Sequence, residues 1–136
     1  MPSRRSVLGV LAATIAAGTR RAAAADPVDL QLVLAADVSR SINEERFQIQ
    51  RQGYASAIAD PRVVRAMTGG RLGRIALTYC EWSGAAMQRT IVDWSVVNDE
   101  ESAADFATRL LSIPRPFAGP TAIGEGIRFA MAELAR

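Results

Sequence analysis

Hydrophobic residues follow one another almost without a break from Leu30 to Ala36. A run of this length and composition is typical of a strand at the centre of a sheet, covered on both faces. The segment from Ser41 to Glu44 matches a helix capping box, with Ser41 as the N-cap and Glu44 three positions later. The pattern therefore predicts a buried strand that is followed closely by a helix.

The helix after this strand has its apolar side chains at helical spacing and most of its charges on other faces. Its apolar positions are Phe47, Tyr54 and Ile58. The helix is expected to end before Asp60-Pro61, and a short helical turn through Met67 closes at Gly69-Gly70. Two segments rich in β-forming residues follow, 74–82 and 88–97. Their short connection predicts an antiparallel hairpin whose second strand lies at an edge of the sheet.

The rest of the chain is expected to be helical. Asn98 and Glu101 are interpreted as the cap of a helix that packs inward through Ala103, Phe106, Ala107 and Leu110. Two prolines between 113 and 117 indicate a stiff extended link. A final helix opens near Thr121 and carries, at helical spacing, Ile123, Ile127, Met131 and Leu134. The order β-α-β-β-α-α predicts an α/β fold with one parallel strand pair and an antiparallel edge hairpin.

Candidate chemistry lies directly after the first predicted strand. Asp37, Ser39 and Ser41 place one carboxylate and two hydroxyls at alternate positions there. Hard oxygen ligands suit Mg²⁺ or Mn²⁺, and open α/β sheets place their ligand sites at the carboxyl ends of strands. Ordinary structural roles exist for two of the three, because Asp37 can accept backbone N–H groups and Ser41 can cap a helix. Ser39 has no evident structural role, which favours the metal hypothesis.

A second polar position occurs about eighty residues later. The segment 119–124, Gly-Pro-Thr-Ala-Ile-Gly, places Thr121 at the mouth of the final helix. Together with Asp37, Ser39 and Ser41, this arrangement resembles the metal-ion-dependent adhesion site of von Willebrand factor A domains. The resemblance covers roughly residue 28 to the end of the chain. It is nearest to a group of exported bacterial proteins that share this fold.

This resemblance implies a three-layer, Rossmann-like, mostly parallel sheet of von Willebrand A type. It also implies that Ser39, Ser41 and Thr121 bind Mg²⁺ or Mn²⁺, while Asp37 acts mainly through water. A partner protein would then complete the coordination with an acidic side chain. Arg40 departs from the family, which often has glycine there. The chain ends before the third loop, where the family has a further aspartate, so we expect the domain to be incomplete at its C-terminus.

The first 25 residues have the composition of an export signal. Arg4 and Arg5 precede an apolar stretch, and small residues end the segment. The adjacent arginines favour a twin-arginine signal, and an ordinary secretory signal is the alternative. The apolar stretch is shorter than the ~20 residues that span a bilayer. We therefore expect a domain at 26–136 that is periplasmic or secreted and meets the membrane only through this signal.

Charge and composition exclude several functions. After residue 25, 12 arginines face 14 carboxylates, so that part of the chain has a net charge of −2. No basic stripe remains, and nucleic-acid binding is not expected. The chain contains no histidine and no lysine, which excludes a Ser-His-Asp triad, histidine zinc ligands and a P-loop lysine. The single Cys80 has no partner within the chain and is interpreted as a small buried hydrophobe.

The sequence therefore favours an exported binding module with divalent-cation-dependent protein binding, and no enzymatic activity is expected. Ser39 or Ser41 as a nucleophile would have only carboxylates as bases. The alternative is a truncated, non-functional or purely structural fragment of such a domain. One further position stays open, because Glu81 can face the candidate site or lie beside Trp82 as an edge residue.

Overall fold

A three-stranded mixed sheet forms the centre of the computed structural model, which describes residues 26–136. The strand order is β1-β2-β3, with β1 parallel to β2 and β2 antiparallel to β3. The strands are β1 (Gln31–Asp37), β2 (Ile75–Trp82) and β3 (Gln88–Val97). This topology confirms the predicted parallel pair and antiparallel edge hairpin. The predicted export signal at 1–25 lies outside the described residues.

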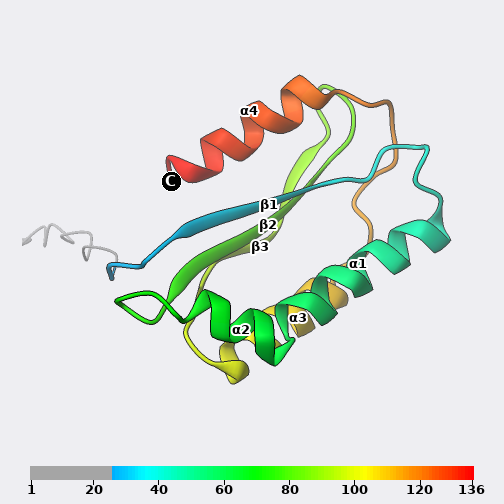
Figure 1. The fold of residues 1–136 in the computed structure, drawn as a ribbon. Helices are drawn as coiled ribbons and strands as arrows, with labels where there is room; N and C mark the ends of the chain where they lie inside the picture. Colours follow the sequence, from blue (N-terminus) through cyan, green and yellow to red (C-terminus); the bar gives the residue numbers. More distant parts are fainter. Residues whose placement is uncertain (1–25) are drawn as a thin grey trace, which may run out of the picture.

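Helices cover both faces of this sheet (Figure 1). Three of them lie on one face: α1 (Glu44–Ile58), α2 (Pro61–Met67) and α3 (Glu100–Ser112). The fourth, α4 (Ile123–Leu134), lies on the opposite face. The fold class is therefore α/β with three layers, as predicted. Among the described residues, no helix is both long and apolar enough to cross a membrane.

The main core lies between the sheet and the layer of α1 and α3. Leu77 and Tyr79 of β2 are buried there against Phe106 and Leu110 of α3. The Tyr79 ring meets the Tyr54 ring of α1 edge to face, with ring centroids 5.1 Å apart. All four positions predicted to face inward on α3 are buried. This apolar layer holds the carboxyl ends of β1 and β2 in place beside the loops that follow them.

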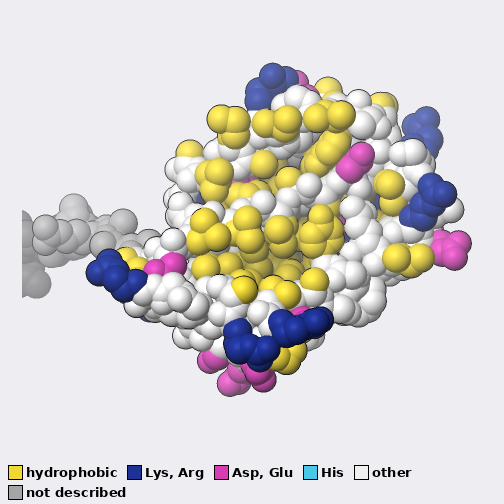
Figure 2. Space-filling view, viewed as in Figure 1, with side chains coloured by type: hydrophobic (Ala, Val, Ile, Leu, Met, Phe, Trp, Pro, Cys, Tyr) yellow, Lys and Arg dark blue, Asp and Glu magenta, His cyan; other side chains and the backbone are white. Residues whose placement is uncertain are grey.

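The fourth helix contacts the sheet through small and polar groups. A Cβ added at Gly126 would lie 2.6 Å from the Trp82 ring, so only glycine permits this approach. Buried Glu133 accepts a hydrogen bond from Thr90, and its carbonyl accepts one from the Trp94 indole. The apolar positions of α4 are 47–64% exposed: Ile123, Ile127, Met131 and Leu134. Hydrophobic side chains also gather on the face of the molecule seen in Figure 2.

The first strand differs from its prediction. β1 lies at an edge of the described sheet, and Ala36 is its only buried residue, so its apolar composition does not place it centrally here. Its outer flank and α4 border a groove of about 430 Å³ that is lined mainly by apolar side chains. β3 forms the other edge, as predicted from the hairpin.

Both predicted helix caps are shifted along the chain. Asn43, not Ser41, caps α1 by accepting a hydrogen bond from the backbone N–H of Arg46. The reason is that the chain makes a turn first, in which the N–H of Ile42 donates to the carbonyl of Ser39. Asp99, not Asn98, caps α3 and forms a capping box with Ser102. Ser41 therefore has no capping role.

Candidate functional site

The loop after β1 brings three of the predicted site residues together. The carboxylate of Asp37 accepts a hydrogen bond from the backbone N–H of Ser39 at 2.7 Å. The hydroxyl oxygens of Ser39 and Ser41 are 3.3 Å apart. Ser39 is 1% exposed, whereas Ser41 is exposed at the surface. The loop thus presents a carboxylate and two adjacent hydroxyls at the carboxyl end of a strand.

A second segment, 115–122, lies against this loop. The Arg115 guanidinium donates to the carbonyls of Val38 and Ile42 at 2.8 Å each, and to that of Ser39 at 3.3 Å. It also lies over the Phe47 ring, 5.0 Å from the ring centroid. Three carbonyls of the serine-bearing loop therefore converge on one cation from a distant part of the chain.

The backbone joins the two segments directly. The N–H of Arg40 donates to the carbonyl of Gly119 at 2.8 Å, while the Arg40 side chain is exposed. At this position, where a glycine is frequent in the family that the sequence resembles, the chain uses only the backbone of the residue. The Arg40 side chain forms no hydrogen bond with the hydroxyl of Ser39 or Ser41.

A third segment, the turn after β2, holds the threonine-bearing stretch. Buried Ser83 donates its hydroxyl to the carbonyl of Pro120 at 2.7 Å and accepts the N–H of Gly119 at 3.0 Å. Its carbonyl accepts the N–H of Ala122 at 2.8 Å. A Cβ at Gly119 would lie 2.4 Å from the sulfur of Met87, so a larger residue there would displace the Met87 side chain.

Thr121 lies in this held stretch and is exposed. The N-cap of α4 is Ala122, so the Thr121 hydroxyl does not cap this helix. Within residues 26–136 its hydroxyl takes part in no hydrogen bond, including none to Ser39 or Ser41. The structure thus joins the threonine-bearing segment to the serine-bearing loop through backbone groups, two residues away from Thr121.

The donor set suits a hard divalent cation. The loop after β1 offers one carboxylate and two hydroxyl oxygens, to which Thr121 would add a third hydroxyl. Mg²⁺ accepts few protein ligands when waters fill its other positions. Among the described residues, no group of three or more His, Cys, Asp or Glu side chains is placed to hold a metal. Cation binding here would therefore depend on Ser39, Ser41 and Thr121 together with the Asp37 carboxylate.

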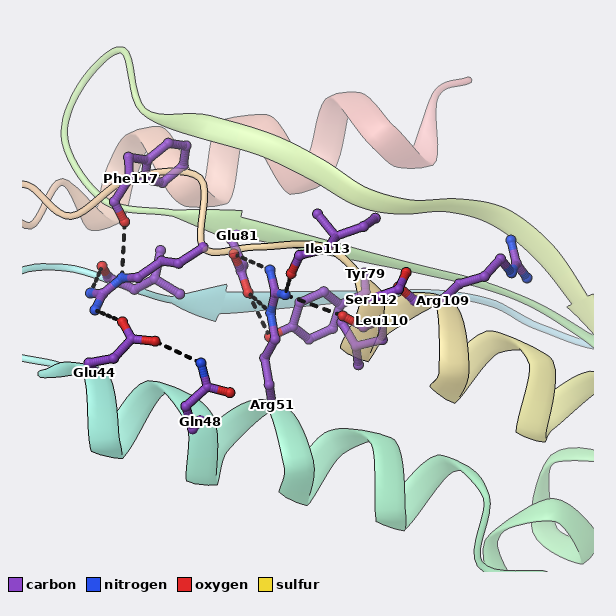
Figure 3. A network of polar contacts seen from close by, with 12 residues as sticks. Glu44, Gln48, Arg51, Tyr79, Glu81, Arg109, Leu110, Ser112, Ile113 and Phe117 are labelled. Carbon is purple, nitrogen blue, oxygen red and sulfur yellow. Dashed lines mark hydrogen bonds and ion pairs between the residues drawn. The ribbon is translucent and has the colours of Figure 1, made fainter.

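A buried ion pair lies next to the site and was not predicted (Figure 3). Arg51 of α1 and Glu81 of β2 form a two-bond pair, with 3% and 0% of their side chains exposed. The interpretation of Glu81 as an edge residue is therefore wrong. Arg51 also donates to the carbonyls of Leu110 and Ile113 at the end of α3.

The sequence holds a signal for this pair. Glu81 lies two and four residues after Tyr79 and Leu77 on β2, so all three share one face of the strand. Leu77 and Tyr79 face the core. Arg51 lies four residues after Phe47 and four before Ala55, on the buried face of α1. Two opposite charges on facing buried surfaces predict an ion pair.

Burial also raises the pKa values of two neutral side chains of β2, Tyr79 and Cys80. It raises the pKa of the Tyr79 hydroxyl well above its usual range, and the nearby Glu81 carboxylate adds to this effect. Burial raises the pKa of the Cys80 thiol to about 12. Cys80 is fully buried, which confirms its interpretation as a small hydrophobe. Neither group is suited to proton transfer or nucleophilic attack at neutral pH.

Comparison with known proteins gives one family and two similar solved structures. The family model described as "Protein of unknown function (DUF1194)" matches residues 27–136. No curated protein matches this chain. One similar solved structure is the von Willebrand factor domain of the type V pili tip protein Mfa5 from Porphyromonas gingivalis. It has 16% identity and a TM-score of 0.44, with 79% of this chain and 33% of that chain covered.

The second solved structure contains three N-terminal domains of the same pili tip protein from Porphyromonas gingivalis. It has 16% identity and a TM-score of 0.42, with 79% of this chain and 17% of that chain covered. The chain therefore spans a third or less of the length of these structures. The first of them is a von Willebrand factor domain, the kind that the sequence resembles.

Proposed function

The chain belongs to the DUF1194 family, and we propose that it acts as an exported binding module that contacts a partner protein through a divalent cation. The observation that carries this proposal is the pair of hydroxyls on Ser39 and Ser41, 3.3 Å apart beside the Asp37 carboxylate. Neither serine caps the following helix, since Asn43 does so. The two hydroxyl oxygens bond each other and keep lone pairs that could ligate a cation.

Each residue has a definite part in this proposal. Ser39 and Ser41 would ligate the cation directly, Thr121 would approach from the neighbouring segment, and Asp37 would act mainly through water. Asp37 also orients the loop, because its carboxylate accepts the N–H of Ser39. The bound Mg²⁺ or Mn²⁺ would supply an open coordination position for an oxygen ligand. The partner would be a protein that offers an Asp or Glu side chain there.

Export fits this proposal. The twin-arginine-like segment at 1–25 would deliver the domain to the periplasm or beyond the cell, and the membrane would be met only through that segment. The remaining chain carries a small net negative charge and no basic stripe, which is consistent with a protein partner and not with nucleic acid.

Cation binding is the first test. Titration of the purified protein with Mn²⁺, followed by the loss of the free-ion EPR signal, should show one weak site. We expect a Kd on the order of 10⁻⁴ to 10⁻³ M, the range in which extracellular modules bind Ca²⁺. Ser39→Ala should abolish that site. Ser56→Ala, at an exposed position on α1, is the matched control and should bind like the wild type. Equal binding by all three proteins would reject the site.

Partner chemistry is the second test. A fluorescent oligoglutamate peptide should bind the protein in Mg²⁺ and lose binding in EDTA, whereas an oligoglutamine peptide should not bind in either buffer. Ser39→Ala should behave like the wild type in EDTA. Peptide binding that is the same with and without EDTA would reject a cation-dependent contact.

A purely structural product is the second candidate. It is favoured by the position of β1 at an edge of the described sheet and by the exposed apolar face of α4, because such surfaces promote association. This candidate predicts concentration-dependent association at every Mg²⁺ concentration, together with no Mn²⁺ site. Analytical ultracentrifugation with and without Mg²⁺ distinguishes it from the binding module.

A further inference from the structure

Arg115 shapes the serine-bearing loop from outside it. One nitrogen of its guanidinium meets the carbonyls of Val38, Ser39 and Ile42, so these three carbonyls must turn to one side of the loop. Another nitrogen donates to the carbonyl of Phe117 and ties the guanidinium to its own segment. The planar guanidinium fork holds these two nitrogens at a fixed separation, so it reaches the loop carbonyls and Phe117 together, which the single nitrogen of lysine cannot do.

Ser83 holds the threonine-bearing stretch in a similar way. Its hydroxyl is fully buried and makes both of the bonds that a hydroxyl readily makes, one as donor to Pro120 and one as acceptor from Gly119. Its backbone carbonyl accepts a hydrogen bond from the N–H of Ala122. Thr121 lies between two residues that Ser83 fixes, so the position of its backbone is determined on both sides.

The two held segments meet at one bond, from the N–H of Arg40 to the carbonyl of Gly119. Arg40 lies between Ser39 and Ser41, and Gly119 lies two residues before Thr121. The hydroxyls on the two segments therefore take their relative places from Arg115 on one side and Ser83 on the other. Neither residue belongs to the predicted ligand set.

We propose that Arg115 and Ser83 are positioning residues that set the affinity of the candidate site for its cation. The inference rests on the proposed function. Outer groups that orient metal ligands typically change metal affinity about 10- to 100-fold when they are removed. The same range is expected here, because both residues fix backbone groups adjacent to the ligating hydroxyls.

The charge of Arg115 needs a separate control. The Arg115 guanidinium repels a cation at the site, so removing its charge would raise the affinity for the cation. Loosening of the serine-bearing loop would lower that affinity. Arg115→Lys keeps the charge and removes the fork, which isolates the positioning effect. Ser83→Ala changes no charge and removes both bonds of the hydroxyl.

The experiment measures Mn²⁺ affinity by EPR for the wild type, Arg115→Lys and Ser83→Ala, at a temperature well below unfolding. Matched controls are Arg128→Lys and Ser56→Ala, which lie at exposed positions on α4 and α1. Both test variants should bind Mn²⁺ about 10- to 100-fold more weakly, and both controls should match the wild type. Without metal, amide hydrogen exchange at Arg40 and Ala122 should be faster in the test variants and unchanged at Leu77 in the core.

The outcomes separate this inference from the proposed function. Wild-type binding with variant affinities within twofold would overturn the positioning role alone. A wild type that binds no Mn²⁺ would overturn both the proposed function and this inference. If Ser83→Ala fails to fold, Arg115→Lys decides, and failure of both to fold would overturn the inference because the residues would then be general supports of the fold.

Discussion

Arg51 and Glu81 form a two-bond ion pair inside the protein, with Nε–Oε1 and Nη2–Oε2 distances of 2.8 and 3.0 Å. The pair joins the middle of α1 to the end of β2, and Arg51 also holds the carbonyls of Leu110 and Ile113. One side chain thereby fixes the end of α3, from which the segment carrying Arg115 begins. The Phe47 ring connects this pair with the candidate site, because both Arg51 and Arg115 lie over it.

Loss of one partner of this pair should be strongly destabilising. Glu81→Leu leaves a buried guanidinium without a counter-charge, which typically costs ~3–5 kcal/mol. The free energy of unfolding from urea titration should fall by about that amount. The double variant Arg51→Met/Glu81→Leu should recover part of the loss, because it removes both charges. A double variant less stable than Glu81→Leu would contradict this account of the pair.

The helix cap and the site residues should respond differently to substitution. Asn43→Ala removes the cap of α1 and should lower the free energy of unfolding by ~1 kcal/mol. Ser41→Ala should leave the free energy of unfolding within ~0.5 kcal/mol of the wild type, because Ser41 is exposed and caps nothing. Urea titrations of both variants measure the difference. A larger loss from Ser41→Ala would return Ser41 to a structural role.

Cys80 should be unreactive in the folded protein. Its pKa of about 12 leaves a thiolate fraction on the order of 10⁻⁴ at pH 8, and the thiol is fully buried. Labelling by a disulfide reagent should therefore be slow in buffer and complete in 6 M guanidinium, about the usual concentration for unfolding. Rapid native labelling at pH 8 would show that β2 opens locally.

The free energy of unfolding at acid pH should depend on Asp60, the N-cap of α2. Asp60 caps this helix and pairs with Arg62, and these contacts lower its pKa from 3.8 to about 2. The stabilisation is complete above the unfolded pKa of 3.8 and is lost as the pH falls through about 2. NMR titration of the Asp60 carboxyl should show this low pKa, and Arg62→Ala should raise it toward 3.8. A value that Arg62→Ala does not change would show that the backbone bond alone lowers it.

Local patterns predicted the elements well where each residue's role depends on its near neighbours. The strand at Gln88–Val97 has the predicted bounds, because polar and apolar side chains alternate along a hairpin edge. The inward face of α3 also follows directly from helical spacing. The helix caps were misplaced by one or two positions, because Ser41, Asn43, Asn98 and Asp99 all have capping side chains and the preceding turn decides which is used.

The residues that hold the loops of the candidate site could not be predicted from the sequence, for a different reason. Ser83 and Arg115 belong to segments far along the chain from Asp37, and only the packed fold brings them to the serine-bearing loop. The pattern at Asp37, Ser39 and Ser41 is local and was visible in the sequence. The exposure of the α4 apolar face was not, because helical spacing identifies a face and not what covers it.

The position of a bound cation tests the central claim most directly. Crystals grown with Mn²⁺ should show one anomalous peak about 2.1–2.2 Å from the hydroxyl oxygens of Ser39 and Ser41, with Thr121 on the same side and Asp37 one water away. A site without a peak at saturating Mn²⁺, or a peak held only by exposed carboxylates elsewhere, would contradict the proposed cation-dependent binding module.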